Sequence, residues 1–224
     1  MKKILYDFVD LVFPNCCPGC NQPFVSGEEL LCSSCELDLP LFSPDEDILE
    51  YFAGRIDLTD ARAFLKFYNQ GITQKLLHAI KYKGDRALGE YLGAMFIHHL
   101  KSNSVYDHID VLLPVPLHHS KLKARGYNQS EILAKGMADA LRLTVDSTSI
   151  LRVKKSQTQT KKSRAERWQN VSGIFEVKGD LLKGKHVLLV DDVITTGATL
   201  EACAEAIMDT GAASISVAVL AAAM

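Results

Sequence analysis

Residues 187–200, VLLVDDVITTGATL, place two adjacent carboxylates directly after an apolar run and follow them with a loop rich in hydroxyl groups. Vicinal carboxylates can accept hydrogen bonds from two vicinal sugar hydroxyls. The loop that follows offers hydroxyl donors, a glycine that permits close backbone approach and free N–H groups at the start of a helix beginning near Leu200, as phosphate binding requires. A ribose with a 5-phosphate satisfies both halves. We therefore expect the sugar at Asp191 and Asp192, and the phosphate at Thr195, Thr196, Gly197, Ala198 and Thr199.

Two other interpretations of this segment compete. An acidic strand end could hold the magnesium of a nucleoside triphosphatase, and residues 179–186, GDLLKGKH, nearly spell the phosphate loop of that class. However, His186 stands where this loop requires Ser or Thr, and the segment precedes its strand instead of joining strand to helix. The two aspartates could also be an ordinary solvated strand end. We favour the sugar phosphate because its chemical requirements are all met together.

Four of the six cysteines have the spacing of metal ligands. Cys17 and Cys20 form one C-x-x-C pair, Cys32 and Cys35 form a second, and eleven residues separate the pairs. Two such turns supply the tetrahedral sulfur set that Zn²⁺ prefers. With no His, Asp or Glu among the four, the zinc would be structural. Two disulfides or four buried thiols are the alternatives, and Cys16 could replace Cys17 if the turn were wider.

The order of the predicted elements indicates an α/β fold. Apolar, strand-like stretches occur at 61–68, 109–117, 149–153, 187–190 and 214–223, and helical patterns occur at 72–84, 87–101, 129–142 and 200–211. Strands that alternate with helices predict a mainly parallel sheet covered on both faces. Such sheets bind ligands at the carboxyl ends of their strands, which is where Asp191 and Asp192 fall.

The composition and the N-terminal residues limit the cellular compartments and the partners that this protein can be expected to have. The 224 residues are 47% hydrophobic and carry a net charge of −2, so the molecule as a whole is not a binder of polyanions. Asp7 and Asp10 interrupt the apolar stretch that a signal peptide would need, and residues 1–12 fit a short amphipathic helix better. No apolar run is long enough to span a bilayer. We expect a cytoplasmic protein without membrane insertion.

Several motifs together resemble known families. VLLVDDVITTGAT resembles the signature with which type I phosphoribosyltransferases bind phosphoribosyl pyrophosphate (PRPP). The runs LLPVPLHHSKLKARGYNQSEILA and KSQTQTKKSRAERWQNVSGIF, the shorter AIKYKGD and the double C-x-x-C resemble the ComF family, bacterial phosphoribosyltransferase-like proteins linked to competence for DNA uptake. The resemblance covers nearly the whole chain and is weakest at 36–60. It implies a type I phosphoribosyltransferase fold with a small N-terminal, zinc-ribbon-like module.

The resemblance also implies roles for individual residues. Asp191 and Asp192 would hold the ribose hydroxyls, partly through Mg²⁺, and residues 195–199 would bind the 5-phosphate. The loop after the strand at 111–115, with Pro116, Leu117 and His118, would bind pyrophosphate. Lys121, Lys123 and Arg125 would add positive charge just beyond this loop.

A basic stretch corresponds by this resemblance to a mobile lid over the leaving group. Residues 152–167 hold seven Lys or Arg against one Glu. Cations aimed at departing pyrophosphate, with water excluded, would assist the cleavage, and Arg164 and Arg167 are the catalytic candidates, with Lys162 beside them. A solvated basic loop is the alternative. With Trp168 following, the stretch could also contact single-stranded DNA.

Two classes of function are therefore expected. As an enzyme, the protein would transfer ribose 5-phosphate from PRPP to an unidentified acceptor. As a binding protein, it would sense PRPP or a nucleotide without turnover and act as an adaptor with single-stranded DNA and proteins of DNA uptake or recombination. We expect three regions: an N-terminal helix and zinc module at 1–45, a hood and linker at 46–105, and the phosphoribosyltransferase core at 106–224.

Overall fold

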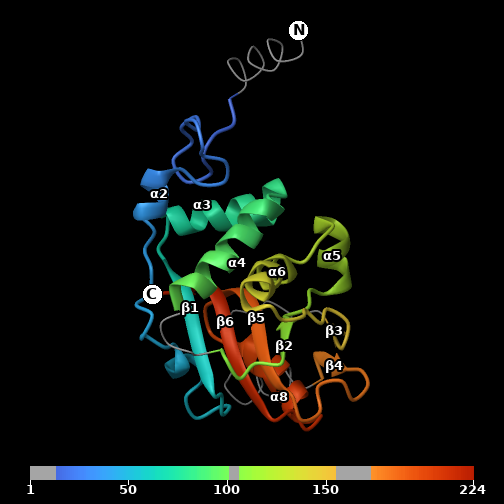
Figure 1. The fold of residues 1–224 in the computed structure, drawn as a ribbon. Coiled ribbons are helices and arrows are strands. Elements are labelled where there is room, and N and C mark those ends of the chain that lie inside the picture. The colour runs from blue at the N-terminus through green and yellow to red at the C-terminus, as the bar shows by residue number, and fades with distance from the viewer. Residues whose placement is uncertain (1–13, 101–105, 155–172) are drawn as a thin grey trace.

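A parallel sheet lies at the centre of the structure, a computed structural model that describes residues 14–100, 106–154 and 173–224 (Figure 1). Within these residues the strand order is β1-β6-β5-β2, and every neighbouring pair is parallel. The strands are β1 (Asp60–Phe67), β2 (Val111–Pro114), β5 (His186–Ile194) and β6 (Ser214–Ala223). The predicted α/β fold with a mainly parallel sheet is confirmed.

Both faces of the sheet are buried, as the continuous apolar runs in its strands require. Along β5, Leu188 and Val190 pack into one hydrophobic cluster, whereas Val187 and Leu189 pack into a second cluster on the opposite face. This alternation follows from the two-residue period of a strand. The sheet is thus fixed from both sides, and the carboxyl end of β5 is held in a defined position.

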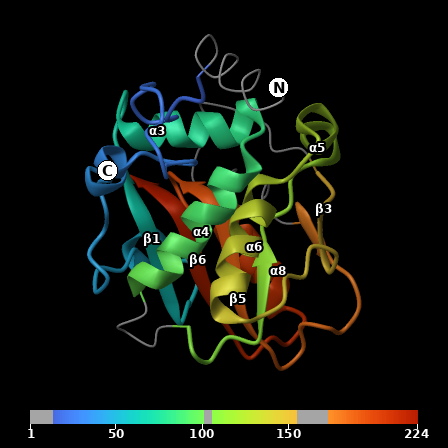
Figure 2. The same ribbon diagram turned by 45° about the horizontal axis from the view of Figure 1, so that its top comes forward.

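Helices cover the two faces of the sheet (Figure 2). One face carries α3 (Ile72–His78), the π-helical turn η2 (Ala79–Lys83), α4 (Arg86–Leu100) and α6 (Gln129–Leu141), and the other carries the 3-10 turn η1 (Leu49–Phe52) and α8 (Ala198–Met208). The helices α4 and α6 are in direct backbone contact, since a Cβ added at Gly136 would lie 1.9 Å from the carbonyl oxygen of Glu90. This close approach fixes the N-terminus of α6, which reaches the carboxyl edge of the sheet.

Three features of the chain differ from the sequence prediction. The strand β5 was expected to end at Val190 but continues to Ile194, so both aspartates lie within the strand. Residues 149–153 were expected to be strand-like, and β3 (Ile150–Arg152) pairs antiparallel with β4 (Phe175–Val177), separately from the main sheet. The short helix α5 (His119–Arg125) was not predicted. The amphipathic helix expected at 1–12 lies outside the described residues.

The cysteine-rich segment packs against α3 and α4 on one face of the sheet. Cys17 and Cys35 belong to the hydrophobic cluster that also contains α3 and α4, and helix α2 (Ser33–Leu37) carries Cys35. Lys75 Nζ on α3 donates a 2.9 Å hydrogen bond to the carbonyl of Gly19. No described helix combines the length and hydropathy that a membrane span needs. The division into three regions stays a prediction.

Candidate functional site

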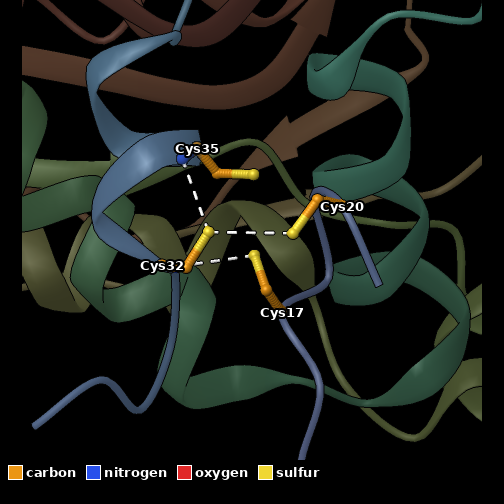
Figure 3. Close-up of side chains that lie close together, drawn as sticks. All are labelled: Cys17, Cys20, Cys32 and Cys35. Carbon is orange, nitrogen blue, oxygen red and sulfur yellow. Dashed lines mark hydrogen bonds between the residues drawn. The ribbon is translucent and has the colours of Figure 1, made fainter. Parts of the chain in front are cut away.

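The four predicted metal ligands converge at one point near the N-terminal end of the described chain (Figure 3). The Sγ atoms of Cys17, Cys20, Cys32 and Cys35 all lie within 4.8 Å of one another, and those of Cys20 and Cys32 are 3.7 Å apart. Four sulfurs around a zinc with Zn–S bonds of about 2.3 Å are separated by about 3.8 Å. The cluster therefore has the dimensions of a tetrahedral zinc site. Cys16 is excluded from it and donates instead to the carbonyl of Pro14.

The backbone around Cys17 suits a thiolate ligand. Burial acts to raise the pKa of Cys17, but hydrogen bonds from the backbone of Cys32, Cys20 and Gly19 outweigh it and lower that pKa to about 7. A thiol with such a pKa loses its proton readily to a metal. Gly19 makes room for the cluster, because a Cβ at this position would lie 2.8 Å from the sulfur of Cys35.

A second site lies where β5 passes into α8. The lining of a small pocket is formed by Asp191 and by the residues from Val193 to Leu200, so it contains the whole predicted phosphate loop, Thr195, Thr196, Gly197, Ala198 and Thr199. Thr195 and Thr196 are exposed. The loop ends at the N-terminus of α8, where backbone N–H groups and the helix dipole favour an anion. The structure thus brings together Asp191 and the loop, which the sequence predicts as two halves of one site.

The conformation of this loop depends on Gly197 and on a segment from a distant part of the chain. Gly197 caps α8 with φ of 76°, a left-handed conformation that favours glycine. A Cβ there would also lie 3.1 Å from the carbonyl oxygen of Tyr51. Arg55 donates to the carbonyl of Thr196 at 3.2 Å and pairs with Glu201 Oε2 at 2.8 Å. The loop is therefore held from the side of η1 and has a fixed shape.

Asp191 has an unusual electrostatic environment. Its Oδ1 accepts hydrogen bonds from the hydroxyl of Ser130 at 2.8 Å and from the backbone N–H of Asp192 at 2.9 Å. Burial, followed by the charge of Asp192, raises the pKa of the Asp191 carboxyl to about 7, although both hydrogen bonds act in the opposite direction. A carboxyl group whose pKa is raised this far by its surroundings is typical of a functional site.

Asp191→Asn is expected to stabilise the protein at about pH 8 and to leave its stability unchanged near pH 4. The carboxyl ionises near pH 4 in the unfolded chain but near pH 7 in the folded protein. Stability of the wild type therefore falls as the pH rises from about 4 to about 7, and the loss is complete above that range. Asparagine has no such loss and keeps an oxygen for the hydroxyl of Ser130. The difference between the two pKa values corresponds to at most about 4 kcal/mol in the free energy of unfolding. The expected gain is about 2 kcal/mol, because Asp191 is partly exposed.

Thermal unfolding measured without added Mg²⁺ at both pH values tests this expectation. Asp139→Asn is the matched control, because Asp139 is an exposed acid on α6. If Asp191→Asn is not more stable than the wild type at about pH 8, the assigned environment of Asp191 is wrong. The same holds if Asp139→Asn is stabilised equally.

Asp192 faces a different partner. Its Oδ2 lies 2.8 Å from Nζ of Lys81, which comes from η2 on the face of the sheet that α3, α4 and α6 cover. The side chains of Asp192 and Lys81 are only 16% and 21% exposed. The two adjacent aspartates therefore use separate partners from the same face, one a hydroxyl on α6 and the other a cation on η2.

The predicted pyrophosphate loop lies at the end of the neighbouring strand. Pro116, Leu117 and His118 are half-buried after β2, and the backbone N–H of Val115 donates to Val190 of β5 at 2.8 Å. None of them lines the pocket of Asp191. The side chain of His118 accepts from the N–H of Ser120 and caps α5.

The cations predicted to contact pyrophosphate, from α5 and from the basic stretch at 152–167, differ in their surroundings. Lys121 is exposed on α5. Arg125 donates to Oε1 of Gln129 at 2.8 Å and lies 5.5 Å from the centre of the Tyr82 ring. Arg164, Arg167 and Lys162 lie outside the described residues.

Sequence reasoning missed three contacts of this site, those of Ser130, Lys81 and Arg55. Ser130 and Lys81 lie in the runs YNQSEILA and AIKYKGD, which supplied the family resemblance without a role for either residue. Arg55 is in the segment where that resemblance is weakest. Only the three-dimensional structure shows that all three reach the aspartates or their loop.

Comparison with known proteins defines the class of this domain. Residues 128–224 match the phosphoribosyl transferase domain family. This match covers α6, β5, α8 and β6, and therefore both aspartates and the loop after them. Together with the parallel sheet and the N-terminal cysteine cluster, it confirms the predicted type I phosphoribosyltransferase fold with an N-terminal cysteine module.

The similar whole proteins are competence and DNA-utilization proteins, which confirms the resemblance to the ComF family. The chain is 28% identical over 145 residues to the DNA utilization protein YhgH of Escherichia coli O157:H7, covering 63% of each chain. It is 35% identical over 110 residues to competence protein F of Haemophilus influenzae, covering 48% of each chain. The match thus spans less than two thirds of either relative.

A solved structure with partial similarity is glutamine PRPP amidotransferase from B. subtilis. The likeness has a TM-score of 0.42 and 23% sequence identity, and covers 60% of this chain and 26% of that one.

Proposed function

We propose that the protein binds PRPP with magnesium at the carboxyl end of β5 and transfers its ribose 5-phosphate to an acceptor. The observation that carries this proposal is the single pocket lining that joins Asp191 to the loop from Thr195 to Thr199. The carboxylate that accepts from the ribose hydroxyls and the loop that donates to the 5-phosphate are then adjacent, as the hydroxyls and the phosphate are in the ligand. The phosphoribosyl transferase domain match over the same residues supports the proposal.

The residues have distinct tasks in this reaction. The bond between C1 of the ribose and the pyrophosphate oxygen breaks, its electron pair leaves with pyrophosphate, and a nucleophilic atom of the acceptor bonds to C1 and loses a proton. Asp191 and Asp192 orient the ring through its hydroxyls, and the N–H groups at the start of α8 fix the 5-phosphate. Positive charge that develops on the ribose is stabilised by the nearby carboxylates.

The donor atoms fit the two metals that this proposal includes. Adjacent carboxylates supply the hard oxygen ligands that Mg²⁺ prefers, and magnesium would neutralise charge on the leaving pyrophosphate. The four sulfurs within 4.8 Å fit a structural Zn²⁺ that closes the N-terminal module. Arg164 and Arg167 remain the proposed catalytic cations of the lid, while Lys121 and Arg125 remain proposed ligands of the pyrophosphate.

Calorimetric titration with PRPP tests the binding step. The protein is expected to bind PRPP more tightly in the presence of Mg²⁺ than without added Mg²⁺. Release of pyrophosphate during incubation with PRPP and a fractionated metabolite extract then tests transfer, and the active fraction identifies the acceptor. If the protein binds PRPP neither with nor without added Mg²⁺, the proposal is wrong.

A second candidate is a sensor of PRPP or a nucleotide that acts as an adaptor in DNA uptake or recombination, with direct contact to single-stranded DNA. The names of the similar proteins, DNA utilization protein and competence protein F, favour this function. Intact PRPP binding without pyrophosphate release across all extract fractions supports the sensor. Fluorescence anisotropy with a labelled oligonucleotide, with and without PRPP, measures the DNA contact.

A further inference from the structure

Lys81 occupies a position at the site that the proposed reaction has not used. Its amino group forms a 2.8 Å ion pair with Asp192, and both side chains are largely buried. Exposed ion pairs contribute little to stability, whereas a buried one requires good geometry to offset desolvation. Here the pair lies beside a second carboxylate, that of Asp191, which already has a raised pKa. A cation in this position neutralises part of a concentrated negative charge.

The backbone holds Lys81 at this place. The turn η2 is π-helical, and the backbone N–H of Gly84 closes it by donating to the carbonyl of Ala79. The hydroxyl of Tyr127 donates to the carbonyl of Ile80, the residue before Lys81. Short π-helical segments inside α-helices occur frequently at functional sites, because the extra residue redirects a side chain. The turn is therefore fixed against the loop between α5 and α6.

The chemistry of the proposed ligand places a phosphate group within reach of this lysine. If Asp191 and Asp192 accept from the 2- and 3-hydroxyls, the C1 carbon of the ribose is one or two bonds from the hydroxylated carbon nearest Asp192. The pyrophosphate is attached at C1. The lysine stem is flexible and carries a compact charge with three donors, so it can turn from a carboxylate to a nearby phosphate.

We propose that Lys81 is a substrate-contacting residue that exchanges Asp192 for the pyrophosphate attached to C1. The inference rests on the proposed function and extends it, because it adds a residue to the leaving-group side of the site. Asp192 becomes available to magnesium and to the ribose hydroxyl in the same event. Ligand binding and release of the ion pair are then a single exchange of charges.

Binding of two probes to Lys81→Met tests this proposal, the probes being PRPP and ribose 5-phosphate, each with Mg²⁺. A charge-assisted hydrogen bond to phosphate is worth about tenfold to hundredfold in affinity. Affinity for PRPP is expected to fall by about that factor, while affinity for ribose 5-phosphate, which has no pyrophosphate, does not fall. Lys81→Arg keeps the charge and is expected to retain most of the PRPP affinity.

Lys83→Met is the matched control, since Lys83 is exposed on the same turn. An unchanged PRPP affinity in folded Lys81→Met, or equal losses for both probes, overturns the role of Lys81. Failure of the wild type to bind PRPP overturns the proposed function instead, so the two failures are distinguishable.

A second comparison covers the case in which Lys81→Met leaves Asp192 unpaired and fails to fold. In Asp192→Asn the amino group of Lys81 keeps an amide oxygen to which it can donate, and in the double variant Lys81→Met/Asp192→Asn both charges of the ion pair are absent. The double variant is expected to bind inorganic pyrophosphate about tenfold more weakly than Asp192→Asn does. Equal affinities for pyrophosphate contradict the proposal.

Discussion

Replacement of both aspartates, Asp191→Asn/Asp192→Asn, is expected to weaken PRPP binding at least about 100-fold. Hydrogen bonds from the ribose hydroxyls to ionised groups contribute about 1.5–3 kcal/mol each, so loss of two corresponds to about 3–6 kcal/mol. Asparagine is isosteric with aspartate but lacks the charge that magnesium and the hydroxyls require. Calorimetric titration with PRPP and Mg²⁺ measures the difference.

The double variant Asp139→Asn/Asp180→Asn is the control for loss of negative charge. Both residues are exposed, one on α6 and the other before β5, and their replacement changes the net charge by the same amount. PRPP affinity close to that of the wild type in the variant at 191 and 192 would show that the ribose site lies elsewhere. Equal weakening in both double variants would show a general charge effect.

Removal of the cysteine ligands is expected to have the second large effect. Cys32→Ser/Cys35→Ser should abolish a zinc content of about one ion per chain and unfold the N-terminal module. Structural zinc contributes about 10–16 kcal/mol of binding free energy in small zinc-finger peptides, and most of it is folding free energy. Cys35 is also 7% exposed within the hydrophobic cluster that includes α3 and α4, so its loss should lower the melting temperature of the whole protein.

Elemental analysis after reductive purification and thermal unfolding measure these two effects. Cys16→Ser is the matched control, because Cys16 adjoins the cluster and is not part of it. Absence of zinc from the wild type, or zinc retained by Cys32→Ser/Cys35→Ser, would disprove the assignment of the ligands.

The sequence predicts the parts of this molecule whose signals are local. The aspartates and the loop after them are contiguous in the sequence, and the four cysteines are closely spaced, so the sequence alone predicts that each group lies together in the structure. Helix α5 could not, because none of its seven residues is buried and it has no apolar stripe. The end of β5 was also missed, since pairing of Asp191 with Val219 extends the strand through polar residues.

The partners of the aspartates depend on the tertiary structure. Ser130 is 61 positions from Asp191, and Arg55 is 146 positions from Glu201, yet each pair is in hydrogen-bond contact. No local pattern distinguishes a serine at a helix start that contacts a carboxylate from one that only caps the helix. Lys81 of η2 is equally inconspicuous, because its contact with Asp192 depends on a π-helical turn that periodicity does not reveal.

Helix α3 and the turn η2 form one continuous helical segment with a contact at each end. Lys75 of α3 donates to the carbonyl of Gly19, which lies between Cys17 and Cys20, and Lys81 of η2 forms an ion pair with Asp192 near the end of β5. A displacement of the turn that carries Gly19 is therefore expected to reach Lys81, six residues further along this segment. Preparations that differ in the zinc occupancy of the cysteine cluster are expected to differ in their affinity for the same ligand.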